Sequence, residues 1–100
     1  MIPDIVYNEF HIDFSLPFED QPDCLTEDLL QLNLGNNRLL DIGWYPEFDP
    51  GGCFLIQVIH DNDWLEPEFS VFTRSEADLR NAVTECIRRA GGTAPADQPG

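Results

Sequence analysis

The chain has 100 residues, of which 42% are hydrophobic and 11% aromatic, so it is long and apolar enough to fold as one domain and is not disordered by composition. Its 19 acidic residues against five arginines give a net charge of −14, and with no basic stripe to neutralise phosphates we expect no direct binding to nucleic acid. No apolar run approaches the roughly 20 residues that span a membrane, so we expect no membrane association.

The charge is distributed unevenly along the chain. Residues 1–73 contain fifteen acidic residues and one arginine, a net charge of −14, whereas residues 74–100 contain four of each sign. Two interpretations stay open: the acids form an ordinary solvated surface, or they create a field that attracts a basic protein partner.

Cysteine usage and the first residues indicate the compartment. Cys24, Cys53 and Cys86 are odd in number and widely spaced, which favours buried thiols in a reducing environment over disulfides. The first ten residues lack the basic and apolar segments of a signal peptide. We therefore expect a cytoplasmic protein.

Residues 9–16, EFHIDFSL, alternate between polar and apolar side chains. The apolar members are Phe10, Ile12, Phe14 and Leu16. A period of two over eight residues predicts a half-buried strand, which the following proline ends.

Residues 24–34, CLTEDLLQLNL, fit two structures. Thr26 followed by two acids is typical of a helix N-terminus, whereas the alternation of residues 30–34 is typical of a strand. We prefer a short helix that ends near Gln31 and keep the strand as the alternative.

Three further strands are predicted at 38–45, 53–60 and 68–74, joined by turn-rich connections. In the first, alternation puts Trp44 on the same face as Leu40 and Ile42, pointing inward. The second is apolar except for one glutamine, so it should lie centrally in the sheet or be covered on both sides.

The last element is a helix that begins after Ser75, with Asp78 in the acidic position of a capping box. Gly91 and Gly92 should end it. Its apolar stripe comprises Leu79, Ala82, Val83, Cys86, Ile87 and Ala90. The prediction is an α+β fold: an antiparallel meander of about four strands with a C-terminal α-helix packed on one face, residues 1–90 forming a single domain and residues 91–100 a flexible polar tail.

Catalytic and metal-binding patterns are weak. His60 beside Asp61 could form a His–carboxylate pair, but a strand-end histidine is the simpler interpretation, and no nucleophile or phosphate-binding motif is present. Asp61, Asp63 and Glu66 suggest calcium, yet an EF-hand loop beginning at Asp61 would need glycine at position 66 and glutamate at position 72. We predict no enzyme activity, no cofactor and no metal.

Two connections, at residues 43–52 and 60–68, combine large aromatic residues with carboxylates. Protein interfaces share this combination, although aromatic residues near turns also cover hydrophobic cores. We divide the two loops evenly between interface and scaffold. The candidate partner-binding residues are Glu47, Phe48, Asp49, Asp61, Asp63, Trp64 and Glu66. Trp64, which lies off the strand pattern, is the better exposed anchor.

The run LLDIGWYPEFDPGGCFLIQVIHDNDWLEPEFSVFTRSEADL resembles small bacterial immunity proteins of polymorphic or contact-dependent toxin systems, over residues 38–90. The features that carry the resemblance are the D-I-G-W-Y-P strand end, the D-P-G turn, the apolar strand, the D-W-x-x-P stretch and the last helix. The resemblance implies tight, non-catalytic binding of one cognate toxin domain in the cytoplasm, and assigns no binding residue.

Many delivered toxins are nucleases with basic clefts, towards which a chain of net charge −14 would be steered. Three alternatives stay open: an acidic nucleic-acid mimic of the anti-restriction or anti-CRISPR type, a small enzyme with a cleft at His60 and Asp61, and a structural or adaptor subunit. The sequence does not indicate an oligomeric state.

Overall fold

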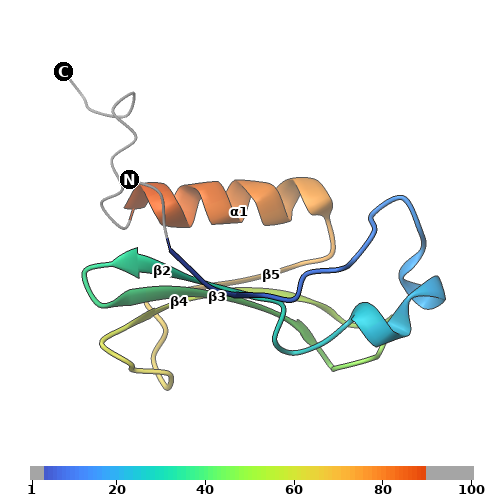
Figure 1. Ribbon diagram of the computed structural model, residues 1–100, viewed down its shortest axis with the longest axis horizontal. Coiled ribbons are helices and arrows are strands. Elements are labelled where there is room, and N and C mark those ends of the chain that lie inside the picture. Colours follow the sequence, from blue (N-terminus) through green and yellow to red (C-terminus); the bar gives the residue numbers. More distant parts are fainter. Residues whose placement is uncertain (1–3, 90–100) are drawn as a thin grey trace.

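The computed structural model describes residues 4–89, which form a five-stranded antiparallel sheet with one long helix against one of its faces (Figure 1). The strands follow one another in both sequence and space: β1 (Asp4–Asn8), β2 (Leu30–Gly35), β3 (Arg38–Tyr45), β4 (Cys53–His60) and β5 (Phe69–Thr73). The helices are α1 (Glu76–Arg89) and two 3-10 turns, η1 (Phe18–Asp20) and η2 (Pro22–Cys24). The predicted α+β class is confirmed, with five strands instead of about four.

The strands predicted at 38–45 and 53–60 are confirmed as β3 and β4, and the strand predicted at 68–74 is confirmed as the shorter β5. In the β3–β4 ladder Trp44 lies opposite Phe54 and Ile42 opposite Ile56, so alternate residues of both strands share one face. Trp44 and Phe54 are fully buried on that face, as the alternation predicts for Trp44. The apolar β4 lies between β3 and β5, which explains its composition.

Helix α1 begins as predicted. The backbone N–H of Asp78 donates to Ser75 Oγ over 3.2 Å, which satisfies one of the free donors of the first turn. Leu79 and Cys86 are buried against the sheet. Ala90, the glycine stop at 91–92 and the tail at 91–100 lie outside the described residues.

The strand predicted at residues 9–16 is wrong. This segment is irregular, and the first strand is β1, before it. Its apolar residues nevertheless pack as the alternation indicated: the rings of Phe10 and Phe14 each lie 5.9 Å from that of Phe54, although Leu16 is exposed. The backbone is held by the side chain of Gln21, which accepts from the N–H of Asp13 and donates to its carbonyl, both over 2.8 Å.

The preferred helix at residues 24–31 is also wrong, and the alternative strand is correct from residue 30 as β2. The carbonyl of Thr26, which would begin a helix, instead accepts the backbone N–H of Trp44 over 2.9 Å. Leu25 and Leu29 are fully buried with a spacing of four, so packing against the core imitates a helical pattern.

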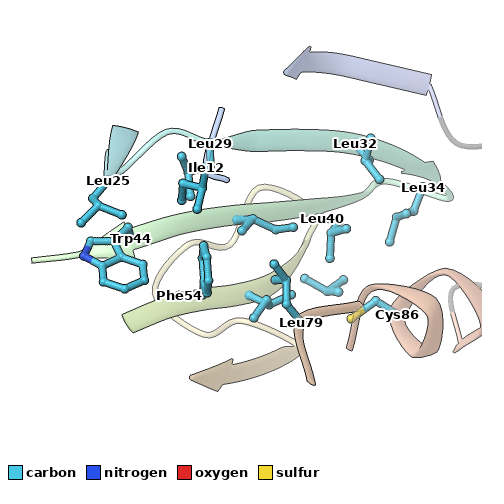
Figure 2. Close-up of a cluster of buried hydrophobic side chains, with 13 residues drawn as sticks. Ile12, Leu25, Leu29, Leu32, Leu34, Leu40, Trp44, Phe54, Leu79 and Cys86 are labelled. Carbon is cyan, nitrogen blue, oxygen red and sulfur yellow. The ribbon is translucent and has the colours of Figure 1, made fainter. Parts of the chain in front are cut away.

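The core lies between α1 and one face of the sheet and extends under the 9–24 segment (Figure 2). At this end the indole of Trp44 meets Phe54 edge-on at 4.9 Å and Phe18 at 4.7 Å. The same indole donates from Nε1 to the carbonyl of Asp49 over 2.7 Å, which ties the β3–β4 connection to the core.

Candidate protein-binding surface

The sheet face away from α1 carries a row of polar side chains. Tyr7, Gln31, Asp41, Gln57 and Ser70 lie opposite one another, one from each of the five strands. The single long helix of the described chain covers the other face (Figure 1). An antiparallel sheet with one face on the core commonly leaves the other to solvent or to a partner.

Asp41 is the centre of this row and is only 7% exposed. Its Oδ1 accepts hydrogen bonds from the hydroxyl of Tyr7 and from Nε2 of Gln31, each over 3.3 Å. Burial raises the pKa of the Asp41 carboxyl, the two hydrogen bonds oppose that rise, and the charge of Asp28 adds to it. The net direction is a raised pKa.

The segment between η2 and β2 brings more carboxylates to this face. Its backbone crosses Gly43 so closely that a Cβ there would lie 2.1 Å from the carbonyl oxygen of Glu27. Glycine at position 43 is therefore what lets Glu27 and Asp28 approach. The side chain of Glu47, from the β3–β4 connection, accepts the backbone N–H of Glu27 over 3.2 Å.

We call these six residues the tyrosine–carboxylate cluster: Tyr7, Glu27, Asp28, Asp41, Tyr45 and Glu47. Burial first, and then the surrounding carboxylates, raise the pKa values of Tyr7 and Tyr45, so both phenols stay neutral donors at physiological pH. Carboxylates beside aromatic rings suit a guanidinium or ammonium group, which can take charge-assisted hydrogen bonds and stack on a ring.

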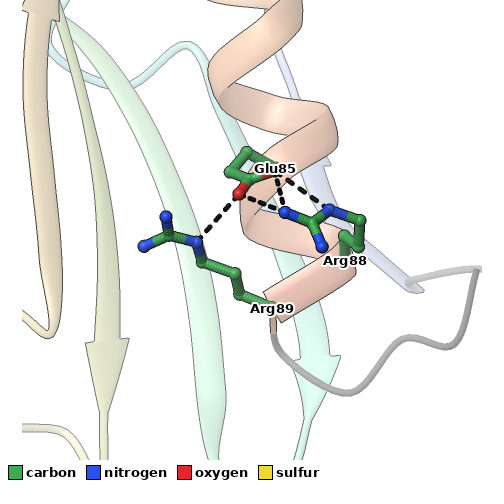
Figure 3. A network of polar contacts seen from close by, with 3 residues as sticks. All are labelled: Glu85, Arg88 and Arg89. Atoms are coloured by element: carbon green, nitrogen blue, oxygen red, sulfur yellow. Dashed lines mark hydrogen bonds and ion pairs between the residues drawn. The ribbon is translucent and has the colours of Figure 1, made fainter. Parts of the chain in front are cut away.

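The arginines of the described chain are engaged elsewhere. Arg38 forms a two-pronged pair with Glu68 over 2.7 and 3.0 Å. On α1, Arg80 pairs with Glu76, while Arg88 and Arg89 both bind Glu85 (Figure 3).

Arg74 donates to the carbonyls of Pro50 and Gly52 and lies 5.0 Å from the ring of Phe18. Within residues 4–89, no arginine forms an ion pair with a carboxylate of the cluster. The arginines of the described residues thus form their ion pairs with other carboxylates.

The predicted site residues of the β3–β4 connection serve different purposes. Glu47 belongs to the cluster, and Phe48 is 53% exposed with a left-handed φ of 64°. Asp49 shapes the turn: its Oδ1 accepts the N–H of Gly51 over 2.8 Å, and its carbonyl accepts the Trp44 indole. This loop is partly scaffold and partly contact surface.

The other predicted residues lie in the β4–β5 connection, at the opposite end of the sheet. The eight residues of β4 separate the two loops by about 24 Å at 3.4 Å per residue. The structure therefore does not unite the seven candidates in one site. Trp64 is 48% exposed as predicted, and Asp63 Oδ1 accepts the N–H of Glu66 over 3.3 Å.

His60 lies near two carboxylates: its Nε2 is 3.5 Å from Asp61 Oδ2 and its Nδ1 is 3.8 Å from Glu68 Oε2. A neighbouring cavity of about 290 Å³ is lined by Arg38, Val58, Glu68, Phe69, Cys86 and Arg89. Among residues 4–89, no group of three or more His, Cys, Asp or Glu side chains is arranged to hold a metal ion.

Sequence reasoning missed most of the cluster. The alternation of β3 already placed Asp41, Gly43 and Tyr45 on one face, which was the available signal. Tyr7 reaches that face only through the unpredicted β1. Leu65, which is 93% exposed, was also missed beside Trp64.

No protein-family model, curated protein or solved structure matches this chain. Between residues 4 and 89, no helix has the length and apolar character needed to cross a bilayer.

Proposed function

We propose that this protein is an immunity protein, a non-catalytic inhibitor that binds one cognate bacterial toxin domain in the cytoplasm through the tyrosine–carboxylate cluster. The observation that carries the proposal is the group of carboxylates on the open sheet face to which no arginine of residues 4–89 is paired. The resemblance of residues 38–90 to small immunity proteins supports the toxin as the partner.

The partner that fits this surface is basic. A toxin that cleaves nucleic acid needs arginine and lysine in its substrate cleft, and those groups would bind the carboxylates in place of phosphates. The net charge of −14 would accelerate the encounter, and the neutral phenols of Tyr7 and Tyr45 would add aromatic area and hydrogen bonds. Exposed Phe48, beside Glu47, supplies an apolar anchor at the rim.

The test uses the toxin domain encoded beside this gene, with association followed by stopped-flow fluorescence over a range of salt concentrations. The triple variant Glu27→Gln, Asp28→Asn and Glu47→Gln removes three charges from the cluster while keeping the hydrogen-bond acceptors. We expect association to slow by about tenfold or more, the dissociation constant to rise, and the salt dependence to weaken.

The matched control is Asp61→Asn, Asp63→Asn and Glu66→Gln, which removes the same net charge at the other end of the sheet. A smaller effect from this control assigns the contact to the cluster. An equal effect from both triples would mean that only overall charge matters, and a larger one from the control would move the interface to the β4–β5 connection. A neighbouring toxin that fails to bind the wild-type chain would overturn the proposal.

A further inference from the structure

The two edges of the sheet are protected differently. An exposed edge strand offers unpaired backbone groups to another strand, and proteins usually guard it with charges, prolines or bulges. The β1 edge begins with Asp4, and its register with β2 shifts between Ile5 and Tyr7. The β5 edge, FSVFT, has no charged residue, no proline and a regular register with β4 along its whole length.

Charge also distinguishes the two edges. Residues 4–68 contain fifteen acidic residues and one arginine, whereas residues 69–89, which form β5 and α1, contain three acidic residues and four arginines. Two copies of a chain with net charge −14 repel each other least where these near-neutral parts meet. The unprotected edge lies on that side of the molecule.

We propose that β5 pairs with β5 of a second copy, antiparallel and around a two-fold axis through Val71, to form a continuous ten-stranded sheet. This register places Phe69 opposite the partner's Thr73, and Ser70 opposite the partner's Phe72. Residues 69, 71 and 73 share the helix side of the sheet and residues 70 and 72 the other side, so every pair matches in face. The contact is self-complementary, as a two-fold interface requires.

The pairing accounts for the exposure of Phe72. It is 62% exposed in the single chain, on an edge strand where a polar residue would guard against pairing. In the dimer it lies beside the partner's Ser70. The tyrosine–carboxylate cluster stays open in this arrangement, because its strand residues lie on β1 and β3, and β4 separates β3 from the β5 edge.

The test measures the mass of the full-length chain by sedimentation equilibrium, from micromolar to submillimolar concentration. The monomer mass is 11.4 kDa, and we expect the weight-average mass to rise towards twice that value and no further. Phe72→Lys places two like charges at the two-fold contact and should weaken dimerisation at least about tenfold. Leu65→Lys, at a 93% exposed apolar position outside β5, makes the same charge change and should leave dimerisation unaltered.

Circular dichroism spectra establish that both variants are folded. Hydrogen exchange of wild-type β5 amides should slow with concentration, and this slowing should disappear in Phe72→Lys. A wild-type chain that stays at 11.4 kDa throughout would overturn the dimer. So would equal weakening by both variants, or a mass that grows beyond the dimer as open β1–β5 pairing would produce. No toxin is needed, so failure here leaves the proposed function unaffected.

Discussion

Phe54 and Phe72 occupy neighbouring strands but opposite faces of one sheet. Phe54 is fully buried and contacts the rings of Phe10, Phe14, Phe18 and Trp44, whereas Phe72 is 62% exposed. The helix-covered face carries the main hydrophobic core, while the open face carries carboxylates, phenols and exposed Phe72, together with buried Ile59. Because strand side chains alternate, substitutions one residue apart should separate stability from recognition.

The largest expected effect compares these two phenylalanines directly. Phe54→Ala should lower the free energy of unfolding by about 4 kcal/mol, because it removes a buried ring from the aromatic end of the core. Phe72→Ala, the same change on the open face, should cost about 0.5 kcal/mol. Urea denaturation of both variants measures the difference, and similar losses would contradict the division between faces.

Gly43→Ala tests whether the backbone of residues 26–29 packs directly against Gly43 of β3. A Cβ would lie 2.1 Å from the carbonyl oxygen of Glu27, so the backbone must move, at a cost of about 3 kcal/mol. Gly51→Ala is the control, because its closest neighbour is Asp49 Oδ1 at 3.2 Å in an exposed turn. Thermal denaturation should leave the control close to wild type. Equal melting temperatures for the two variants would rule out the close approach.

Arg74→Met tests the link between the core and the β3–β4 connection. The change removes the hydrogen bonds to the carbonyls of Pro50 and Gly52 and the stacking on Phe18, which should cost about 1.5 kcal/mol. Arg80→Met removes only an exposed pair with Glu76 on α1 and should cost at most about 0.5 kcal/mol. Urea denaturation compares the two, and a larger loss for Arg80→Met would contradict the assignment.

The smallest expected effect is a gain in stability on the open face. The Asp41 carboxyl has a raised pKa in the folded chain, so it favours folding below its ordinary pKa and loses that contribution as pH rises through the folded-state value. Asp41→Asn should therefore stabilise the fold at pH 7, and the gain should vanish at about pH 3. Urea denaturation at the two pH values measures it, with Asp20→Asn as the control, because Asp20 is exposed and lies outside the cluster.

If the stability gained by Asp41→Asn increased as the pH fell, the result would contradict a raised pKa for Asp41. Tyr7→Phe offers a second check on the same group. Loss of the hydroxyl removes a hydrogen bond that favours the charged carboxylate, so the pKa of Asp41 should rise further and stability at pH 7 should fall.

Local sequence patterns predicted the structure correctly where each residue's role depends on its neighbours in sequence. The alternation of β3 identified Trp44 as buried, and Ser75 identified the start of α1. These patterns failed at residues 9–31, where alternation and helical spacing described burial correctly except at Leu16 but did not describe the backbone. There the hydrogen bonds come from Gln21 and from Trp44, which no local pattern reports.

The candidate site shows the same division. Exposed Trp64 was predicted from its sequence context, and Glu47 and Phe48 from their loop. The tyrosine–carboxylate cluster was not, because Tyr7 and Asp41 are 34 residues apart and meet only through the pairing of β1 with β2 and of β2 with β3.

The sequence by itself determined the α+β class, the three strands of the meander, the capped last helix and the one-sided acidic charge. These features depend on neighbouring residues and on composition: period-two and helical spacing, capping chemistry and net charge. They can therefore be recognised without a structure. Only the tertiary structure decided which acids gather on one face, which arginines are already paired, and which edge strand is unprotected. Those features depend on contacts between distant segments, whose register is set by the packing of the whole sheet.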